Sequence, residues 1–187
     1  MKRSRKIAVL AHCILNQNAK VEDIALFPGV IPDVVNLVVE RGYGILQMAC
    51  PETLHLGLGR WECIKDQYET PAFRHLCERL ATETLDQLED YEKNGYKIGP
   101  IIGIDGSPSC GVSKSCRADE KGENPKWFGS VHSPPSWIIT DESGVFFDVI
   151  REEAKRRGKS YTYIGIPEVP EVGDFEDAMK KLDKLLT

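Results

Sequence analysis

Three of the six cysteines stand directly after segments that have the apolar composition of buried strands. Cys13 follows the first such segment, Cys50 the second and Cys110 the third. In a parallel sheet the carboxyl ends of neighbouring strands lie about 5 Å apart at one edge, where open α/β folds bind their ligands. We therefore expect these three thiols to converge on one site, although they are 37 and 60 residues apart in the sequence (50 − 13 and 110 − 50).

The cysteine pattern favours metal binding or catalysis over disulfide bonds. The basic start Met1–Lys6 leads into an apolar run too short for a signal peptide, so we expect a cytoplasmic protein, in which disulfides are uncommon. The sequence has no Cys-x-x-Cys pair of the kind that zinc ribbons use. Cys77 lies on the apolar stripe of a predicted helix and should be a core residue. Cys63 and Cys116 lie in predicted loops, and we expect neither to be a fourth ligand or a resolving thiol.

Side chains next to these cysteines add acid–base and hydrogen-bonding groups. Glu52 comes two residues after Cys50, and a carboxylate beside a metal can hold or deprotonate water as a general base. Its simpler role is a surface charge or a helix cap. Ser107 and Ser109 precede Cys110, and their hydroxyls can bind the sulfurs of a cluster or a substrate, or simply form a turn.

Residues near the expected mouth of the site are candidates for substrate binding. Asn16 and His12 flank Cys13, where Asn16 is a candidate substrate contact and His12 a candidate ligand or acid. Arg60 can contact an anionic or carbonyl group of a substrate. Trp61 can stack on a planar heterocycle, although a tryptophan more often packs in a core.

Three short segments of the sequence resemble the signatures of the 2-thiouracil desulfidase family in their order and approximate spacing. They are Ala11-His-Cys-Ile-Leu-Asn16, Cys50-Pro-Glu52 and Ser107-Pro-Ser-Cys-Gly111. The resemblance extends from the beginning of the chain to just beyond Gly111. The chain departs from the family pattern at His12, over Leu56–Trp61 and at Asp105-Gly106, which surround the expected mouth, so we expect a related subfamily.

The resemblance implies a cofactor, a reaction and the residues that serve them. It implies a [4Fe-4S] cluster on Cys13, Cys50 and Cys110, with one iron that has no protein ligand. It implies Glu52 as the catalytic acidic residue and Ser107 as the active-site serine. The implied reaction removes sulfur from a small thiocarbonyl compound, such as a thiolated nucleobase, and gives the carbonyl product and sulfide.

Other functions fit the same residues. Three thiolates together with water or His12 can bind zinc, which would indicate a zinc-binding hydrolase. A non-catalytic iron–sulfur or thiol redox module could use Cys110 and Cys116 as a thiol–disulfide pair. A nucleotide-binding α/β module with inert thiols ranks last, because the sequence has no phosphate-binding loop.

Strand-like and helix-like segments alternate along the chain, and this order favours a parallel sheet with helices on both faces. The predicted strands are the apolar run at the start of Lys6–Leu15, Tyr43–Ala49, Ile98–Ile104 and Tyr161–Ile166. The predicted helices are Ile31–Arg41, Pro71–Asn94, Val145–Arg157 and Phe175–Leu186. We predict one α/β domain over residues 1–187, a Rossmann-like three-layer fold with a mainly parallel sheet of about four strands. Residues 111–136 are rich in Gly, Pro and Ser and should form a loop or lid.

Composition narrows the range of partners. The chain has 187 residues, of which 41% are hydrophobic and 28% charged, and it contains no run of the ~18–20 apolar residues that a membrane helix needs. The net charge is −5 and the pI about 5.5, whereas proteins that follow many phosphates carry a basic surplus. We therefore expect a small-molecule partner and neither a membrane nor general nucleic-acid binding.

Overall fold

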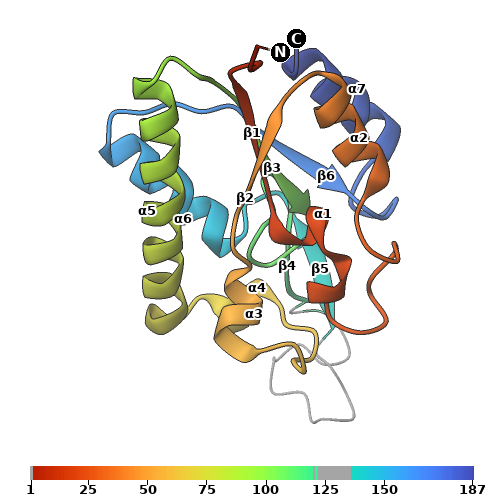
Figure 1. Cartoon of the computed structure of the whole chain (residues 1–187). Helices are drawn as coiled ribbons and strands as arrows, with labels where there is room; N and C mark the ends of the chain where they lie inside the picture. Colours follow the sequence, from red (N-terminus) through yellow and green to blue (C-terminus); the bar gives the residue numbers. More distant parts are fainter. Residues whose placement is uncertain (1, 120, 122–135) are drawn as a thin grey trace.

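A computed structural model of the protein describes residues 2–119, 121 and 136–187 (Figure 1). Its central sheet contains β1 (Lys6–Leu10), β2 (Gly44–Gln47), β3 (Lys97–Asp105) and β6 (Tyr163–Pro167). The strand order is β2-β1-β3-β6, and all three pairings are parallel. The predicted α/β fold with a parallel sheet of four strands is confirmed. The strands followed by Cys50, Cys13 and Cys110 are neighbours in this order.

Four long helices cover the two faces of the sheet. Helices α5 (Pro71–Lys93) and α6 (Val145–Arg156) lie together on one side, and α2 (Pro32–Glu40) and α7 (Phe175–Leu185) lie on the other (Figure 1). Strand β3 is buried from Gly99 to Ile104, because helices cover both of its faces. This burial explains why the strand reads as a continuous apolar run rather than an alternating one.

Local sequence signals set the ends of the long helices. The Thr70 hydroxyl accepts a hydrogen bond from the backbone N–H of Phe73 at 3.2 Å, so Thr70 caps α5. Asp174 caps α7 in the same way, through a 2.8 Å bond from the N–H of Asp177. Gly95 follows α5 with a φ of +78°, a conformation that glycine adopts without strain.

The prediction of a loop over residues 111–136 is wrong for part of that range. Strand β4 (Ser115–Ala118) pairs antiparallel with β5 (Trp137–Thr140), and Cys116 stands opposite Ile139. β4 (Ser-Cys-Arg-Ala) alternates polar and apolar residues over only four positions, and β5 (Trp-Ile-Ile-Thr) does not alternate, so neither stands out as a strand in the sequence. Residues 120 and 122–135 lie outside the described part of the chain, and the lid stays a prediction.

Short helices near the site were also missed by the sequence analysis. These are α1 (His12–Leu15), the 3-10 helix η1 (Gln17–Ala19), α3 (Pro51–Leu56) and α4 (Lys65–Tyr68). Their four to six residues, or three in η1, are too few for a helical period to appear in the sequence. In the part of the chain that the structure covers, no helix is both long and apolar enough to cross a membrane.

A network of charges fixes the β4–β5 hairpin to the rest of the molecule. Arg117 of β4 binds Glu142 at 2.6 Å and Glu69 at 2.8 Å. The buried Lys65 binds Glu142 at 2.7 Å and Asp148 at 3.1 Å. Hydrogen bonds from Arg117, followed by those from Lys65 and Thr140, lower the pKa of Glu142 to about 2.

This network predicts a loss of stability in acid that depends on Glu142. Its pKa is lower in the folded protein than the ordinary value of 4.5, so its contribution is complete above pH 4.5 and is lost as the pH falls toward 2. We expect Glu142→Gln to be less stable than the wild type at neutral pH and to lose less stability over this acid range. Urea unfolding midpoints measured against pH test this. Glu78→Gln, at an exposed position of α5, should show the same pH dependence of stability as the wild type. An equally reduced pH dependence in both variants would contradict the assignment of the acid effect to Glu142.

Candidate functional site

The three predicted cysteines line one cavity at the carboxyl ends of the strands. Cys13 and Cys50 each come three residues after a strand (13 − 10 and 50 − 47), and Cys110 comes five residues after β3 (110 − 105). The cavity has a volume of about 280 Å³, close to the lower limit of ~300–1,000 Å³ for small-molecule sites. Its wall also contains Glu52, Arg60, Ser107 and Ser109. The structure therefore brings most of the predicted site residues together.

The loop that carries Cys110 is held by its own side chains and by β3. The Ser107 hydroxyl accepts hydrogen bonds from the N–H groups of Cys110 at 3.0 Å and Ser109 at 3.3 Å. The Cys110 carbonyl accepts a bond from the N–H of Ile104 at 3.0 Å. The Asp105 carboxylate then binds the backbone just beyond Cys110. These contacts fix where the Cys110 thiol lies before any ligand binds.

Gly103 lets this loop lie directly against β3. A Cβ atom at Gly103 would stand 2.3 Å from the Cys110 carbonyl oxygen and 2.7 Å from the side chains of Val112 and Phe147. We expect Gly103→Ala to lower the free energy of unfolding by about 1–3 kcal/mol, the usual effect of overpacking. The control is Gly29→Ala, whose added Cβ would meet no atom within 4 Å. Urea denaturation compares the two variants. Equal midpoints would show that the loop moves away from the added methyl group with no loss of stability.

Glu52 is held at the cavity wall by three donors. It lies in the first turn of α3, which Cys50 caps by accepting a 3.4 Å hydrogen bond from the N–H of Thr53 at its sulfur. The Ser109 hydroxyl donates to Glu52 Oε1 at 2.5 Å. Arg60 Nε and the Tyr68 hydroxyl donate to Oε2 at 3.3 and 3.4 Å. The Glu52 carboxylate is therefore oriented without substrate, as a general base requires.

Arg60 has a different place from the one the sequence suggested. Its side chain is 4% exposed and lies in the cavity wall. Besides Glu52, its guanidinium binds the carbonyl oxygens of Ala19 at 2.8 Å and Gly57 at 3.3 Å. Arg60 thus joins three segments and orients Glu52, and its predicted direct contact with a substrate stays a prediction.

Asn16, Trp61 and His12 are not among the residues of the cavity wall. Asn16 accepts a hydrogen bond from the N–H of Asn18 at 3.2 Å and caps a 3-10 turn. Trp61 is 75% exposed. His12, the nitrogen ligand considered for zinc, bonds to Gln47 at 2.8 Å instead. This placement gives no support to substrate binding by Asn16 or Trp61.

A second ion pair lies in the cavity wall and was not predicted from the sequence. Glu168 directly follows β6 and binds Lys20 Nζ at 2.8 Å, and both residues line the cavity. A signal for Glu168 existed: Pro167-Glu168 repeats, after the strand at the other edge of the sheet, the Pro-Glu pair of Cys50-Pro-Glu52.

Comparison with known proteins gives one close relative. Neither a family model nor a solved structure matches the chain. The chain is 35% identical over 113 residues to the "Uncharacterized protein MJ0003" of Methanocaldococcus jannaschii, across 60% of this chain and 72% of that protein. The chain belongs to the same family as MJ0003. The name of MJ0003 states no activity, so the function of this family member has to be inferred from the site itself.

Cys13, Cys50 and Cys110 of the present protein, a relative of MJ0003, form a donor set that suits an iron–sulfur cluster. Burial raises the pKa of Cys13, and so do the nearby charges of Glu168 and Cys50. Burial followed by the charges of Cys13 and Cys50 raises the pKa of Cys110. Cys110 is buried, and Cys13 and Cys50 are half-buried, so three thiolates lining this cavity would need a positive partner. Soft thiolates favour zinc, copper(I) or an iron–sulfur cluster.

A cluster and a single ion place different demands on the candidate ligands. Among the described residues, no three His, Cys, Asp or Glu side chains form a group that could hold a metal ion. A cubane cluster is larger than an ion, and its thiolate ligands bind different iron atoms, so they stand farther apart. Three thiols are soft donors that suit a [4Fe-4S] cluster or a zinc ion, so the metal content decides between the two.

Proposed function

We propose that this protein is a desulfidase that removes sulfur from a small thiocarbonyl compound, such as a thiolated nucleobase. In this proposal a [4Fe-4S] cluster is held by Cys13, Cys50 and Cys110. The observation that carries it is that these three thiols line the same small cavity as Glu52, whose carboxylate is already oriented by neighbouring donors. Free thiols and a cluster of this kind suit a reducing compartment, and we infer a cytoplasmic location.

The cluster and the protein have separate tasks. When bound, a cluster with three thiolate ligands supplies one iron with no protein ligand, a Lewis acid with affinity for sulfur. Glu52 accepts a proton from the water that attacks the thiocarbonyl carbon. The carbon–sulfur bond breaks as the new carbon–oxygen bond forms, so thiocarbonyl and water give carbonyl and hydrogen sulfide with no net oxidation or reduction.

Serine hydroxyls connect Glu52 to the cysteine loop. Ser109 Oγ lies 2.5 Å from Glu52 Oε1 and 3.4 Å from Cys110 Sγ, so it orients the base beside a cluster ligand. Ser107 accepts two backbone N–H groups, and its own hydroxyl proton is left to donate to Ser109 or to a substrate. In the proposed reaction Ser107 stabilises the negative charge that develops on the substrate.

A thiol redox module is the second candidate, and one observation favours it. Cys63 and Cys116 also line the cavity, so five thiols face one space. Burial, the first of several causes, raises the pKa of Cys116 to about 12. A thiol with so high a pKa is a poor nucleophile in disulfide exchange at neutral pH, which favours the desulfidase.

Protein purified and reconstituted without oxygen tests the proposal. We expect iron and acid-labile sulfide in near-equal amounts, and conversion of 2-thiouracil or a related thione to its oxo product with release of sulfide. Zinc in place of iron, or no metal under these conditions, would contradict the desulfidase and favour the zinc-binding hydrolase or the thiol module respectively.

A further inference from the structure

The ion pair of Lys20 and Glu168 lies at the opposite edge of the sheet from Glu52. Glu52 follows β2 and Glu168 follows β6, which are the two outer strands in the order β2-β1-β3-β6. Both carboxylates influence Cys13, which follows an inner strand. The pair and Glu52 thus line one cavity with Cys13, and the Ala19 carbonyl next to Lys20 accepts a hydrogen bond from Arg60, the partner of Glu52.

The pair is buried and rigidly placed. The side chains of Lys20 and Glu168 are 14% and 7% exposed. Gln17 Nε2 donates to Glu168 Oε1 at 3.0 Å and to the Cys13 carbonyl at 2.9 Å. Gln17 thus connects the Glu168 carboxylate to the backbone of Cys13, a proposed cluster ligand. These hydrogen bonds hold Glu168 in position relative to Cys13.

Both charged groups keep hydrogen-bonding capacity that the described residues do not use. An ammonium has three N–H donors, and the one hydrogen bond of Lys20 Nζ within the described part of the chain goes to Glu168. A carboxylate has about four acceptor positions, of which Lys20 and Gln17 occupy two. The neighbouring wall is apolar and includes Val21 and Val172. A ligand that supplies an acceptor to Lys20 and a donor to Glu168 is therefore favoured.

The charges in the wall favour a neutral ligand. The two buried ion pairs each cancel, Glu62 is exposed, and Asp105 accepts hydrogen bonds from the N–H groups of Val112 and Ser113 at 2.8 and 2.9 Å. A carboxylate ligand bound to Lys20 would be repelled by the adjacent Glu168 carboxylate. A cationic ligand bound to Glu168 would be repelled by the adjacent Lys20 ammonium. An amide edge, which places a carbonyl oxygen beside an N–H group, satisfies both side chains without net charge.

We propose that Lys20 and Glu168 determine specificity by binding the amide edge of a neutral heterocycle. Lys20 donates to the carbonyl oxygen of this edge, and Glu168 accepts from the adjacent N–H. The inference rests on the proposed function, because it assigns the substrate-recognising part of the same cavity.

Calorimetry on the anaerobic, cluster-loaded protein tests recognition apart from turnover. The probes are uracil, which has amide edges, and 1,3-dimethyluracil, which keeps the carbonyl oxygens but has no N–H donor. We expect the wild type to prefer uracil, and Lys20→Met and Glu168→Gln to weaken uracil binding by about tenfold to a hundredfold, the effect of a hydrogen bond to a charged group. Glu168→Gln should bind dimethyluracil much as the wild type does, because this probe has no N–H for Glu168 to bind. Lys20→Arg should retain most of the affinity for uracil.

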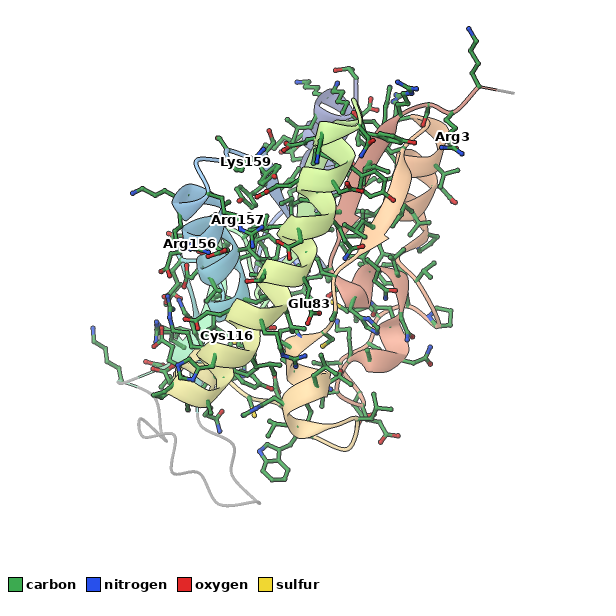
Figure 2. The ribbon with its side chains drawn as sticks, turned by 60° about the vertical axis from the view of Figure 1, so that its left-hand side comes forward. Arg3, Glu83, Cys116, Arg156, Arg157 and Lys159 are labelled. Carbon is green, nitrogen blue, oxygen red and sulfur yellow. The ribbon has the colours of Figure 1, made fainter. Side chains whose placement is uncertain are left out.

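Lys159→Met is the matched control. Lys159 pairs with Glu92 at 2.6 Å and lies at the other end of the molecule from the cavity residue Cys116 (Figure 2). Lys159→Met should leave uracil binding unchanged.

Two results overturn the inference. The first is a wild type that binds both probes equally or does not bind uracil. The second is unchanged uracil binding in both Lys20→Met and Glu168→Gln. These outcomes are independent of whether the protein releases sulfide from 2-thiouracil, which decides the proposed function. Urea midpoints identify any variant that loses binding because it unfolds.

Discussion

Replacing Cys110 by alanine should give a folded protein that retains no iron–sulfur cluster. Cys110 is 5% exposed and faces the cavity with Cys13 and Cys50, so the variant loses one of the three proposed ligands. The neighbouring loop keeps the hydrogen bonds that the Cys110 backbone makes with Ser107 and Ile104, and only the 3.4 Å contact between Ser109 Oγ and the thiol is lost. Iron and acid-labile sulfide per chain after anaerobic reconstitution measure the effect, and we expect both to fall to background.

The chain offers two matched controls for this experiment. Cys77 is fully buried on α5, outside the cavity wall, so Cys77→Ala should lower stability and leave the iron content unchanged. Cys116 lies in the cavity wall without being a proposed ligand, and Cys116→Ala should also keep the iron. Iron in Cys110→Ala at the level of the two controls would show that Cys110 is not a ligand, whereas loss of iron in Cys116→Ala would make Cys116 a ligand.

The parallel sheet could be predicted because its strands are covered on both sides. The observed β3 (Lys97–Asp105) extends one residue beyond each end of the predicted Ile98–Ile104. Strands buried in this way form short apolar runs, and the intervening helices carry apolar stripes and capping residues that mark their ends. Topology then follows from the right-handed crossover of parallel strands, so the strand ends and their cysteines meet at one edge.

The β4–β5 hairpin could not be predicted, because its stability comes from residues far away in the sequence. Arg117 of β4 reaches Asp66 and Glu69 near α4, 51 and 48 residues away. An alternation of polar and apolar residues over only four positions is a weak strand signal of its own. Only the folded chain shows which acidic side chains surround Arg117.

The sequence predicted the site residues that come directly after strands. It did not predict the site residues whose positions depend on pairing with distant side chains. Position after a strand was enough to group Cys13, Cys50 and Cys110. The partner of Lys20 is 148 residues away, and Arg60 binds the carbonyl of Ala19, 41 residues away. Such pairs depend on the final packing of loops, which neither residue type nor local spacing determines.

The second large effect is expected from Glu52→Gln, which should keep the cluster and lose most of the turnover. Glutamine has nearly the same shape, its amide oxygen can accept from Arg60 and Tyr68, and its amide N–H₂ can donate to Ser109. It cannot take a proton from water, so the step that needs a base slows by about 10²–10⁴-fold, the usual contribution of general acid–base catalysis. Sulfide release per bound cluster measures this loss, because it corrects for any difference in iron content.

Glu83→Gln is the control for this substitution. Glu83 lies on α5 in a largely exposed ion pair with Arg79, so the variant should keep full turnover.

Ser109→Ala tests how much the orientation of the Glu52 carboxylate contributes to turnover. It leaves the Glu52 carboxylate in place but removes the 2.5 Å hydrogen bond, so turnover should fall less than in Glu52→Gln. If Glu52→Gln instead releases sulfide at the wild-type rate with a full cluster, the water is deprotonated elsewhere. Glu168 would then be the other buried carboxylate of the cavity wall to examine, and its ion pair with Lys20 would have to open for it to act.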